Sequence, residues 1–296
     1  MEIKPQKFQF KDGTKGEISI SPDFQHKERL KSWIIEKKFN DYIDHKYRMD
    51  RHTRKRNKLY EFHHPVSGTN VILKVSTIDK QYKFLRRINL LISTLFSDYN
   101  FRAFKGSLEL KNIGVNCANP LAYWTETNLF FKKNSYYLYD KIEASHSLFS
   151  FTQKLLPVEK YSNSDLYKLL AKRTTDIIQQ IHSAGFRQGD PHPGNFLVSP
   201  LTKDSNNLSI DDIKQMDMYI IDLDKFSISK PLGPFLKRFF DIRCMRRCTL
   251  GPYNQQEMLK IYLQEDYSAI WKGVLYFWIR GGFNPAKWFR TPKRGQ

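Results

Sequence analysis

A loop rich in glycine and proline, GFRQGDPHPGN at residues 185–195, separates a helix-like segment from two short apolar runs. The helix-like segment runs from about Ser164 to His182 and places its apolar residues at helical spacing. The two apolar runs, FLV and MYII, have the length of short strands, and Asp222 follows the second directly. We therefore expect Asp190, Asn195 and Asp222 to lie on neighbouring loops.

These three residues have the chemistry that phosphoryl transfer requires. The oxygens of Asn195 and Asp222 suit Mg²⁺, a hard ion that prefers oxygen ligands. A carboxylate beside them, that of Asp190, can accept the proton of an attacking hydroxyl. Asp and Asn are common loop residues, and Pro and Gly can merely shape a turn, so each residue alone indicates little. The combination is typical of a phosphotransferase.

A lysine on a predicted strand lies upstream of this loop. The sequence KLYEFHHPVSGTNVILKV predicts a β-hairpin that pairs Leu59–His63 with Val71–Val75 across a turn. Lys74 lies in the second strand, where a lysine is usually a solvated edge residue. The order of a strand lysine, D-x-x-x-x-N and a strand-end aspartate is nevertheless the order of parts in protein kinases.

The remaining segments predict an α+β, bilobal, protein-kinase-like fold. The N-lobe, residues 1–143, is expected to be small and rich in strands, with a helical stretch at 81–113 that ends at Gly114 and a strand in YYLYDKI. The C-lobe, residues 144–296, is expected to be mainly helical. The polar stretch Ser199–Asp217 is interpreted as an exposed insertion.

Three stretches resemble the lipopolysaccharide kinase family, whose members phosphorylate Kdo and heptose sugars of the lipopolysaccharide inner core. They are HSAGFRQGDPHPGNFLV with YIIDLDKF, the stretch NFRAFKGSLELKNIGVNCANPLAYWTE, and the strand YYLYDKIEA. The G-D-P-H-x-G-N-F form is most similar to the core heptose(II) kinases. The resemblance covers about residues 70–250, and the loop motif alone is shared with aminoglycoside phosphotransferases.

The resemblance implies a role for each matching residue and two cofactors, ATP and Mg²⁺. Asp190 is the implied catalytic base, and Asn195 and Asp222 are the implied Mg²⁺ ligands, with Asp224 as a competitor for Asp222. Lys74 would hold the α- and β-phosphates of ATP. Asp140, Lys141 and Ile142 would form a hinge whose backbone meets adenine, and His192 would brace the loop.

The chain departs from the kinase pattern at two places. No G-x-G-x-x-G precedes the hairpin, and a basic stretch with Arg51, Arg54 and Lys55 stands there instead. No obvious glutamate follows Lys74 to pair with it, and Glu109 is the candidate. These departures leave open a catalytically inactive module that binds lipid or a partner. The other alternative is a small-molecule phosphotransferase of the aminoglycoside kinase type.

The net charge of +19 predicts an acidic partner. After Asp266 the chain has six cations, no acid and many aromatic residues, a pattern that suits an anionic membrane surface, nucleic acid or simple packing into the lobe. We expect the glycolipid and the membrane rather than nucleic acid, because no nucleic-acid motif is present. Without a secretory signal or a membrane span, the expected location is the cytoplasmic side of the inner membrane, with three reduced cysteines.

Overall fold

The structure of the chain is a computed structural model, and it describes only part of the 296 residues. The described residues are 4–49, 57–77, 98–128, 131–143, 146–154, 165–199, 209–228, 241 and 261–262. The chain divides into two compact units: unit 1 comprises 1–112 and 117–142, and unit 2 comprises 113–116 and 143–296. Several predictions lie outside the described residues, namely those for Arg51, Arg54 and Lys55, for Cys244 and Cys248, and for the segment after Asp266.

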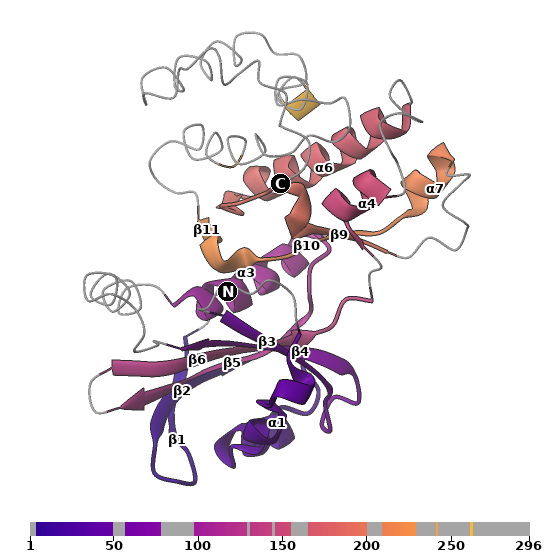
Figure 1. The fold of residues 1–296 in the computed structure, drawn as a ribbon. Helices are drawn as coiled ribbons and strands as arrows, with labels where there is room; N and C mark the ends of the chain where they lie inside the picture. Colours follow the sequence, from indigo (N-terminus) through magenta and orange to yellow (C-terminus); the bar gives the residue numbers. More distant parts are fainter. Residues whose placement is uncertain are drawn as a thin grey trace, which may run out of the picture. The chain divides into compact units, whose positions relative to one another are not determined.

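Unit 1 is built on a six-stranded antiparallel sheet (Figure 1). In spatial order its strands are β1 (Gln6–Gln9), β2 (Lys15–Ile20), β5 (Pro120–Asn128), β6 (Phe131–Asp140), β4 (Asn70–Thr77) and β3 (Asn57–His63). The predicted hairpin is present, because β3 pairs with β4 from Asn57↔Ser76 to His63↔Asn70. Gly68 has a φ of +70° in the turn between them, a conformation that glycine adopts without steric cost.

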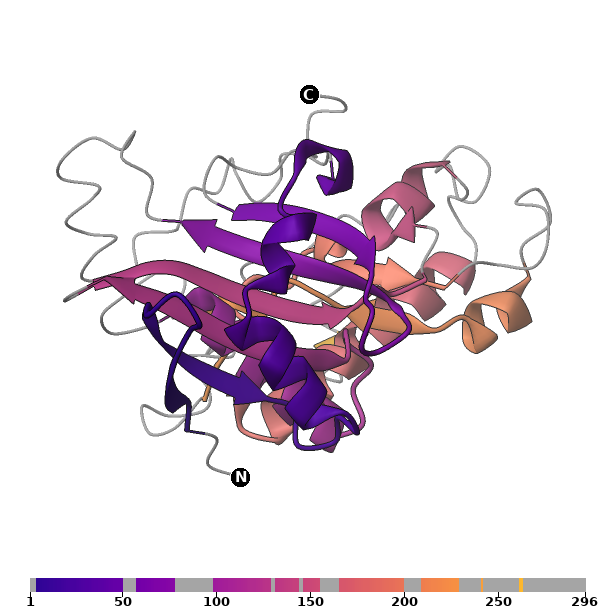
Figure 2. The same ribbon diagram turned by 90° about the horizontal axis from the view of Figure 1, so that it is seen from below.

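The two faces of the sheet are covered by different helical segments. Side chains alternate along a strand, so Leu73 and Val75 lie on the face opposite Lys74. On the first face, α1 (Lys27–Ile35) lies across the strands (Figure 2), and its Trp33 joins the core there, as does Phe39 of the following 3₁₀ turn η1 (Lys38–Tyr42). A second 3₁₀ turn, η2 (His45–Tyr47), precedes β3.

The other face of the sheet packs against α3 (Tyr99–Asn112). The rings of Phe101 and Tyr123 lie 5.0 Å apart, and Ser107 Oγ and Tyr137 Oη are 2.8 Å apart. The predicted helical stretch began at residue 81, and its first part, to residue 97, lies outside the described residues. The chain turns after α3 at Gly114, whose φ is +74°, as the sequence predicted.

Unit 2 contains the helices and short strands that carry the glycine- and proline-rich loop. Its helical elements are α4 (Leu148–Lys154), α6 (Asp165–Ser183), η3 (Pro193–Asn195), α7 (Ile210–Gln215) and η5 (Leu223–Lys225). Its strands are β7 (His146–Ser147), β8 (Phe186–Arg187), β9 (Phe196–Val198), β10 (Met218–Ile220) and β11 (Ser227–Ile228). They form two small sheets, β10-β9-β7 and β11-β8. The α+β fold class is confirmed.

The stretch Ser199–Asp217 is not simply an exposed insertion. Its second half forms α7, which begins with a capping box between Ser209 and Asp212 and buries Ile213. The apolar side chain at the centre of a short capped helix explains why this segment packs on the unit. Among the helices of the described residues, none is long and apolar enough to cross a membrane.

Candidate active site

Asp190 and Asn195 are locked together within the loop that follows β8. The Asn195 side-chain Nδ2 donates to the Asp190 carbonyl oxygen at 2.9 Å, and the Asp190 amide donates to the side chain of Gln188. His192 Nδ1 accepts from the Gly194 amide at 3.1 Å and so closes the turn, as expected of a bracing residue. Because its Nδ2 is committed, the Asn195 amide turns its Oδ1 away from the Asp190 carbonyl.

The β-hairpin of β9 and β10 brings Asp222 to the same loop. The two strands pair from Phe196↔Ile220 to Met218↔Val198, so Asn195 and Ile221 flank the paired region on the same side. The Ile221 amide donates to the Asn195 carbonyl at 2.8 Å and extends the ladder by one step. Gln188 Nε2 also donates to the Asp222 carbonyl at 3.2 Å. The three residues predicted from sequence, Asp190, Asn195 and Asp222, therefore lie together.

Asp222 has a backbone conformation that is unusual for a residue other than glycine. Its φ is +57° and its ψ is +59°, in the left-handed region, and its side chain is exposed. Aspartate tolerates this region better than most residues, and such conformations concentrate at functional sites. Asp224, the competing carboxylate, lies inside η5 and is half-buried. The backbone thus favours Asp222 as the exposed oxygen donor.

The site offers two oxygen donors that suit a magnesium ion. Asn195 offers an amide oxygen and Asp222 a carboxylate, both hard oxygen ligands. The described residues contain no group of three or more His, Cys, Asp or Glu that could hold a metal. Mg²⁺ keeps several waters and binds substrate phosphates, so two protein ligands are sufficient when water and phosphate supply the others.

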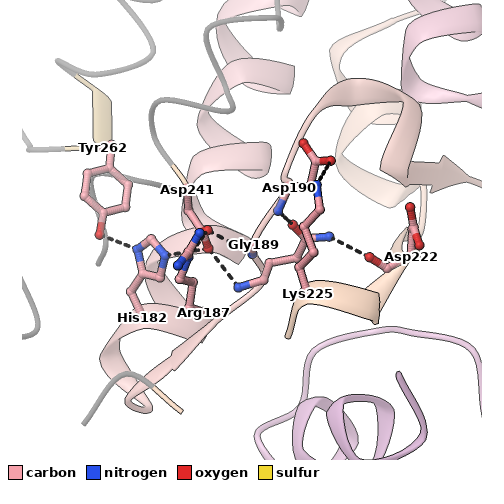
Figure 3. Close-up of polar contacts among 9 residues, drawn as sticks. His182, Arg187, Gly189, Asp190, Asp222, Lys225, Asp241 and Tyr262 are labelled. Carbon is pink, nitrogen blue, oxygen red and sulfur yellow. Dashed lines mark hydrogen bonds and ion pairs between the residues drawn. The ribbon is translucent and has the colours of Figure 1, made fainter. Parts of the chain in front are cut away.

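A glycine lets the segment that carries Asp222 approach the loop. Gly189 has a φ of +94°, and a Cβ placed on it would lie 2.4 Å from Lys225 Cβ and 2.7 Å from the Lys225 carbonyl oxygen. Only glycine fits this space, so the backbone at 225 rests directly on the backbone at 189. The Lys225 Nζ reaches the Asp190 Oδ2 at 2.6 Å (Figure 3).

A buried aspartate that sequence reasoning missed holds the loop from behind. The Asp241 carboxylate is fully buried and accepts from the Gln188 and Gly189 amides at 2.8 and 2.9 Å (Figure 3). It also contacts Arg187 Nε at 3.0 Å and His182 Nε2 at 3.1 Å. Four donors satisfy a carboxylate that burial would otherwise penalise. Asp241 therefore fixes the backbone directly before Asp190.

Tyr262, which the sequence analysis also did not identify, extends this hydrogen-bond network behind the loop. The Tyr262 hydroxyl lies 2.7 Å from His182 Nδ1, and the His182 ring is buried. The sequence offered one signal for Asp241: it is the sole acid between residues 230 and 250, among six cations. An isolated acid in such a segment is a candidate for a buried, satisfied carboxylate.

Lys74 lies on β4 in unit 1, on the face that α3 covers. Its register partner on β6 is Tyr137, and its exposed fraction is 8%. On α3, Ser107 contacts Tyr137, the strand neighbour of Lys74. Residues of a helix share a face when they are three or four apart, and Glu109 is only two residues from Ser107. Glu109 thus projects from another side of α3, which weakens its predicted pairing with Lys74.

The predicted hinge residues are bound within unit 1. The Asp140 amide donates to the Asn119 carbonyl, and the Lys141 amide donates to the Asn70 carbonyl at 2.8 Å. The Lys141 Nζ is 2.6 Å from Glu61 Oε1. The amides of Asp140 and Lys141 are thus already used, so a contact of either residue with adenine would be made by its carbonyl oxygen. Ile142 is the third residue of the predicted hinge.

The six-stranded sheet of unit 1, with α3 on one face, and the helices and short strands of unit 2 have a protein-kinase-like fold. Comparison with solved structures agrees: the chain is similar to WaaP in complex with acyl carrier protein, at 14% identity and a TM-score of 0.58. The match covers 92% of this chain and 99% of that one. No protein-family model matches the chain, and no curated protein matches it.

Proposed function

We propose that this protein is an ATP-dependent kinase that phosphorylates a sugar hydroxyl, of heptose or Kdo, in the lipopolysaccharide inner core. The observation that carries the proposal is the assembly of Asp190, Asn195 and Asp222 on one hydrogen-bonded pair of loops. The resemblance to the lipopolysaccharide kinases, closest to the heptose(II) kinases, supports the acceptor class. The protein-kinase-like fold supports the reaction type.

Each residue has one task in this proposal. Asp190 accepts the proton of the acceptor hydroxyl and orients its oxygen toward the γ-phosphorus. Asn195 and Asp222 hold Mg²⁺, which neutralises phosphate charge when bound. Lys74 contacts the α- and β-phosphates, and the 140–142 backbone meets adenine. Asp241 does not touch substrate and instead positions the backbone that precedes Asp190.

We further propose that the protein acts at the cytoplasmic face of the inner membrane as a peripheral protein. The net charge of +19 supports this, because the acceptor is a phosphorylated glycolipid within an anionic surface. The same charge disfavours a cationic aminoglycoside as the acceptor, since like charges repel.

The direct test is phosphate transfer from labelled ATP to dephosphorylated lipopolysaccharide core, read by mass spectrometry of the product. Asp190→Asn should lower turnover by about 10²–10⁴-fold, the range for losing a positioned base, with ADP binding retained. Asp176→Asn, at an exposed carboxylate on α6, is the matched control and should leave turnover unchanged. Wild-type rates from Asp190→Asn would remove Asp190 from the mechanism.

Two further arms separate the alternatives. Transfer to an aminoglycoside in place of the core would contradict the acceptor class. A melting temperature that Mg²⁺ and nucleotide leave unchanged would instead indicate an inactive binding module.

A further inference from the structure

The fold places a lysine directly beside the proposed base. Lys225 Nζ lies 2.6 Å from Asp190 Oδ2, and the two side chains are 56% and 20% exposed. Arg187, at the end of β8 just before this loop, is bound to Asp241. Lys225 belongs to the segment that carries Asp222, which lies three residues before it.

Backbone contacts fix the position of the Lys225 main chain. Its main chain rests against Gly189, where a Cβ would lie 2.7 Å from the Lys225 carbonyl oxygen. Gln188 Nε2 fixes the start of the same segment through the Asp222 carbonyl. The root of the lysine is thus held while its exposed four-carbon stem can swing the ammonium through several ångströms.

We propose that Lys225 exchanges between the Asp190 carboxylate and the γ-phosphoryl group of bound ATP, as a direct phosphate contact during transfer. This inference rests on the proposed function. An acceptor hydroxyl poised on Asp190 lies about 3 Å from the carboxylate. The phosphorus it attacks lies about 3–3.5 Å beyond that hydroxyl oxygen. An ammonium already on Oδ2 therefore reaches the phosphoryl oxygens by side-chain rotation alone.

The exchange also explains how the pair can accompany catalysis. While Lys225 holds Oδ2, it competes with the acceptor hydroxyl for that oxygen. When the γ-phosphoryl draws the ammonium away, Oδ2 can accept the hydroxyl proton as the acceptor oxygen bonds to phosphorus. The bond from phosphorus to the β,γ-bridging oxygen breaks, and ADP leaves.

The test compares two nucleotides that differ in the γ-phosphoryl group. In titration calorimetry with Mg²⁺, Lys225→Met should weaken binding of β,γ-imido-ATP by about 10- to 100-fold, the loss expected for one charge-assisted hydrogen bond. Binding of ADP should not change, because ADP has no γ-phosphate. Lys225→Arg should restore discrimination between the nucleotides. Lys172→Met, which removes another exposed lysine, paired with Asp176 on α6, should alter neither affinity.

A second measurement uses the unmodified protein and does not depend on the variants folding. Site-resolved acylation of lysines should be slower at Lys225 with β,γ-imido-ATP than with ADP, and equal at Lys172. Equal losses of both nucleotides in Lys225→Met, or equal labelling of Lys225 with both, would overturn the inference while leaving the kinase proposal standing. If the wild-type protein bound neither nucleotide, the kinase proposal itself would fail.

Discussion

His64 is a single residue whose environment opposes its charge. Its ring is fully buried, its Nδ1 accepts from the Ser67 amide at 3.1 Å, and its Nε2 has no hydrogen-bond partner among the described residues. The ring also packs edge to face against Trp33, with the ring centroids 4.6 Å apart. Burial, with a smaller effect of His63, lowers the pKa of His64 from 6.5 to about 4. The folded chain therefore keeps this imidazole neutral.

The lowered pKa makes stability depend on pH in a definite direction. As pH falls below 6.5, His64 binds a proton in the unfolded chain before it does so in the folded chain. The contribution of neutral His64 to the free energy of unfolding is therefore complete above pH 6.5 and is lost as pH falls to about 4. The free energy of unfolding should fall by about 3 kcal/mol over that window from this residue, at 1.36 kcal/mol per pH unit. Urea unfolding at a series of pH values would measure it.

Matched variants isolate the contribution of His64. His64→Asn keeps an acceptor for the Ser67 amide but cannot be protonated, so its unfolding free energy should depend less on pH. His26→Asn, at an exposed position, should keep the wild-type dependence. An unchanged pH dependence in His64→Asn would show that His64 titrates normally.

Single residues also show how far sequence reasoning extends into the site. Asp190, Asn195 and Asp222 were predictable because their motif is local, within loops bounded by short apolar strands. Asp241 was not, because it lies 51 residues beyond Asp190 and its partners, which include the Gln188 and Gly189 amides, belong to no local motif with it. The Lys225 contact was equally hidden, since it depends on the space that Gly189 leaves.

The loop that carries Asp190 and the segment from Asp222 to Lys225 act as one element, because Gly189 permits their contact. Gly189→Ala adds a Cβ at 2.4 Å from Lys225 Cβ and imposes a side chain on a φ of +94°. Gly185→Ala, at a φ of +83° with no atom within 4 Å of its Cβ, is the matched control for backbone cost alone. Gly189→Ala should lower the free energy of unfolding by about 1–3 kcal/mol more than the control, the usual cost of overpacking.

Denaturant unfolding and phosphate transfer, measured on both variants, would test this contact. Because the clash separates Lys225 and Asp222 from Asp190, transfer should be lost in Gly189→Ala and retained in Gly185→Ala. Equal stability of the two variants would mean that the segment around Lys225 yields freely, and that the loops are not one element.

Elements with strong local patterns were predicted, whereas those fixed by distant packing were not. The β3–β4 hairpin and α6 followed from turn residues and helical spacing. In α6, however, the buried surface uses Tyr167, Thr174 and Thr175 in addition to aliphatic residues, because tertiary contacts decide which side chains are covered. The helix α7 was missed although the capping box of Ser209 and Asp212 could be read from sequence.

For the whole molecule, the net charge of +19 predicts reversible binding to anionic membranes. Each cation near such a surface contributes about 1 kcal/mol, and screening limits this to about 8–10 Å from the surface at physiological salt. The six cations after Asp266, with no acid among them, should contribute most. Co-sedimentation should therefore show binding to anionic vesicles that weakens with salt, and little binding to neutral vesicles.

Two variants of equal charge separate that segment from the charge of the whole chain. Replacing Lys272, Lys287 and Lys293 with serine removes three cations after Asp266. Replacing Lys7, Lys11 and Lys15, which are exposed in unit 1, removes three elsewhere. The first variant should lose more vesicle binding than the second, because aromatic residues beside the C-terminal cations favour the interface. Equal losses would assign the binding to overall charge, and equal binding of wild-type protein to neutral and anionic vesicles would contradict an electrostatic attachment altogether.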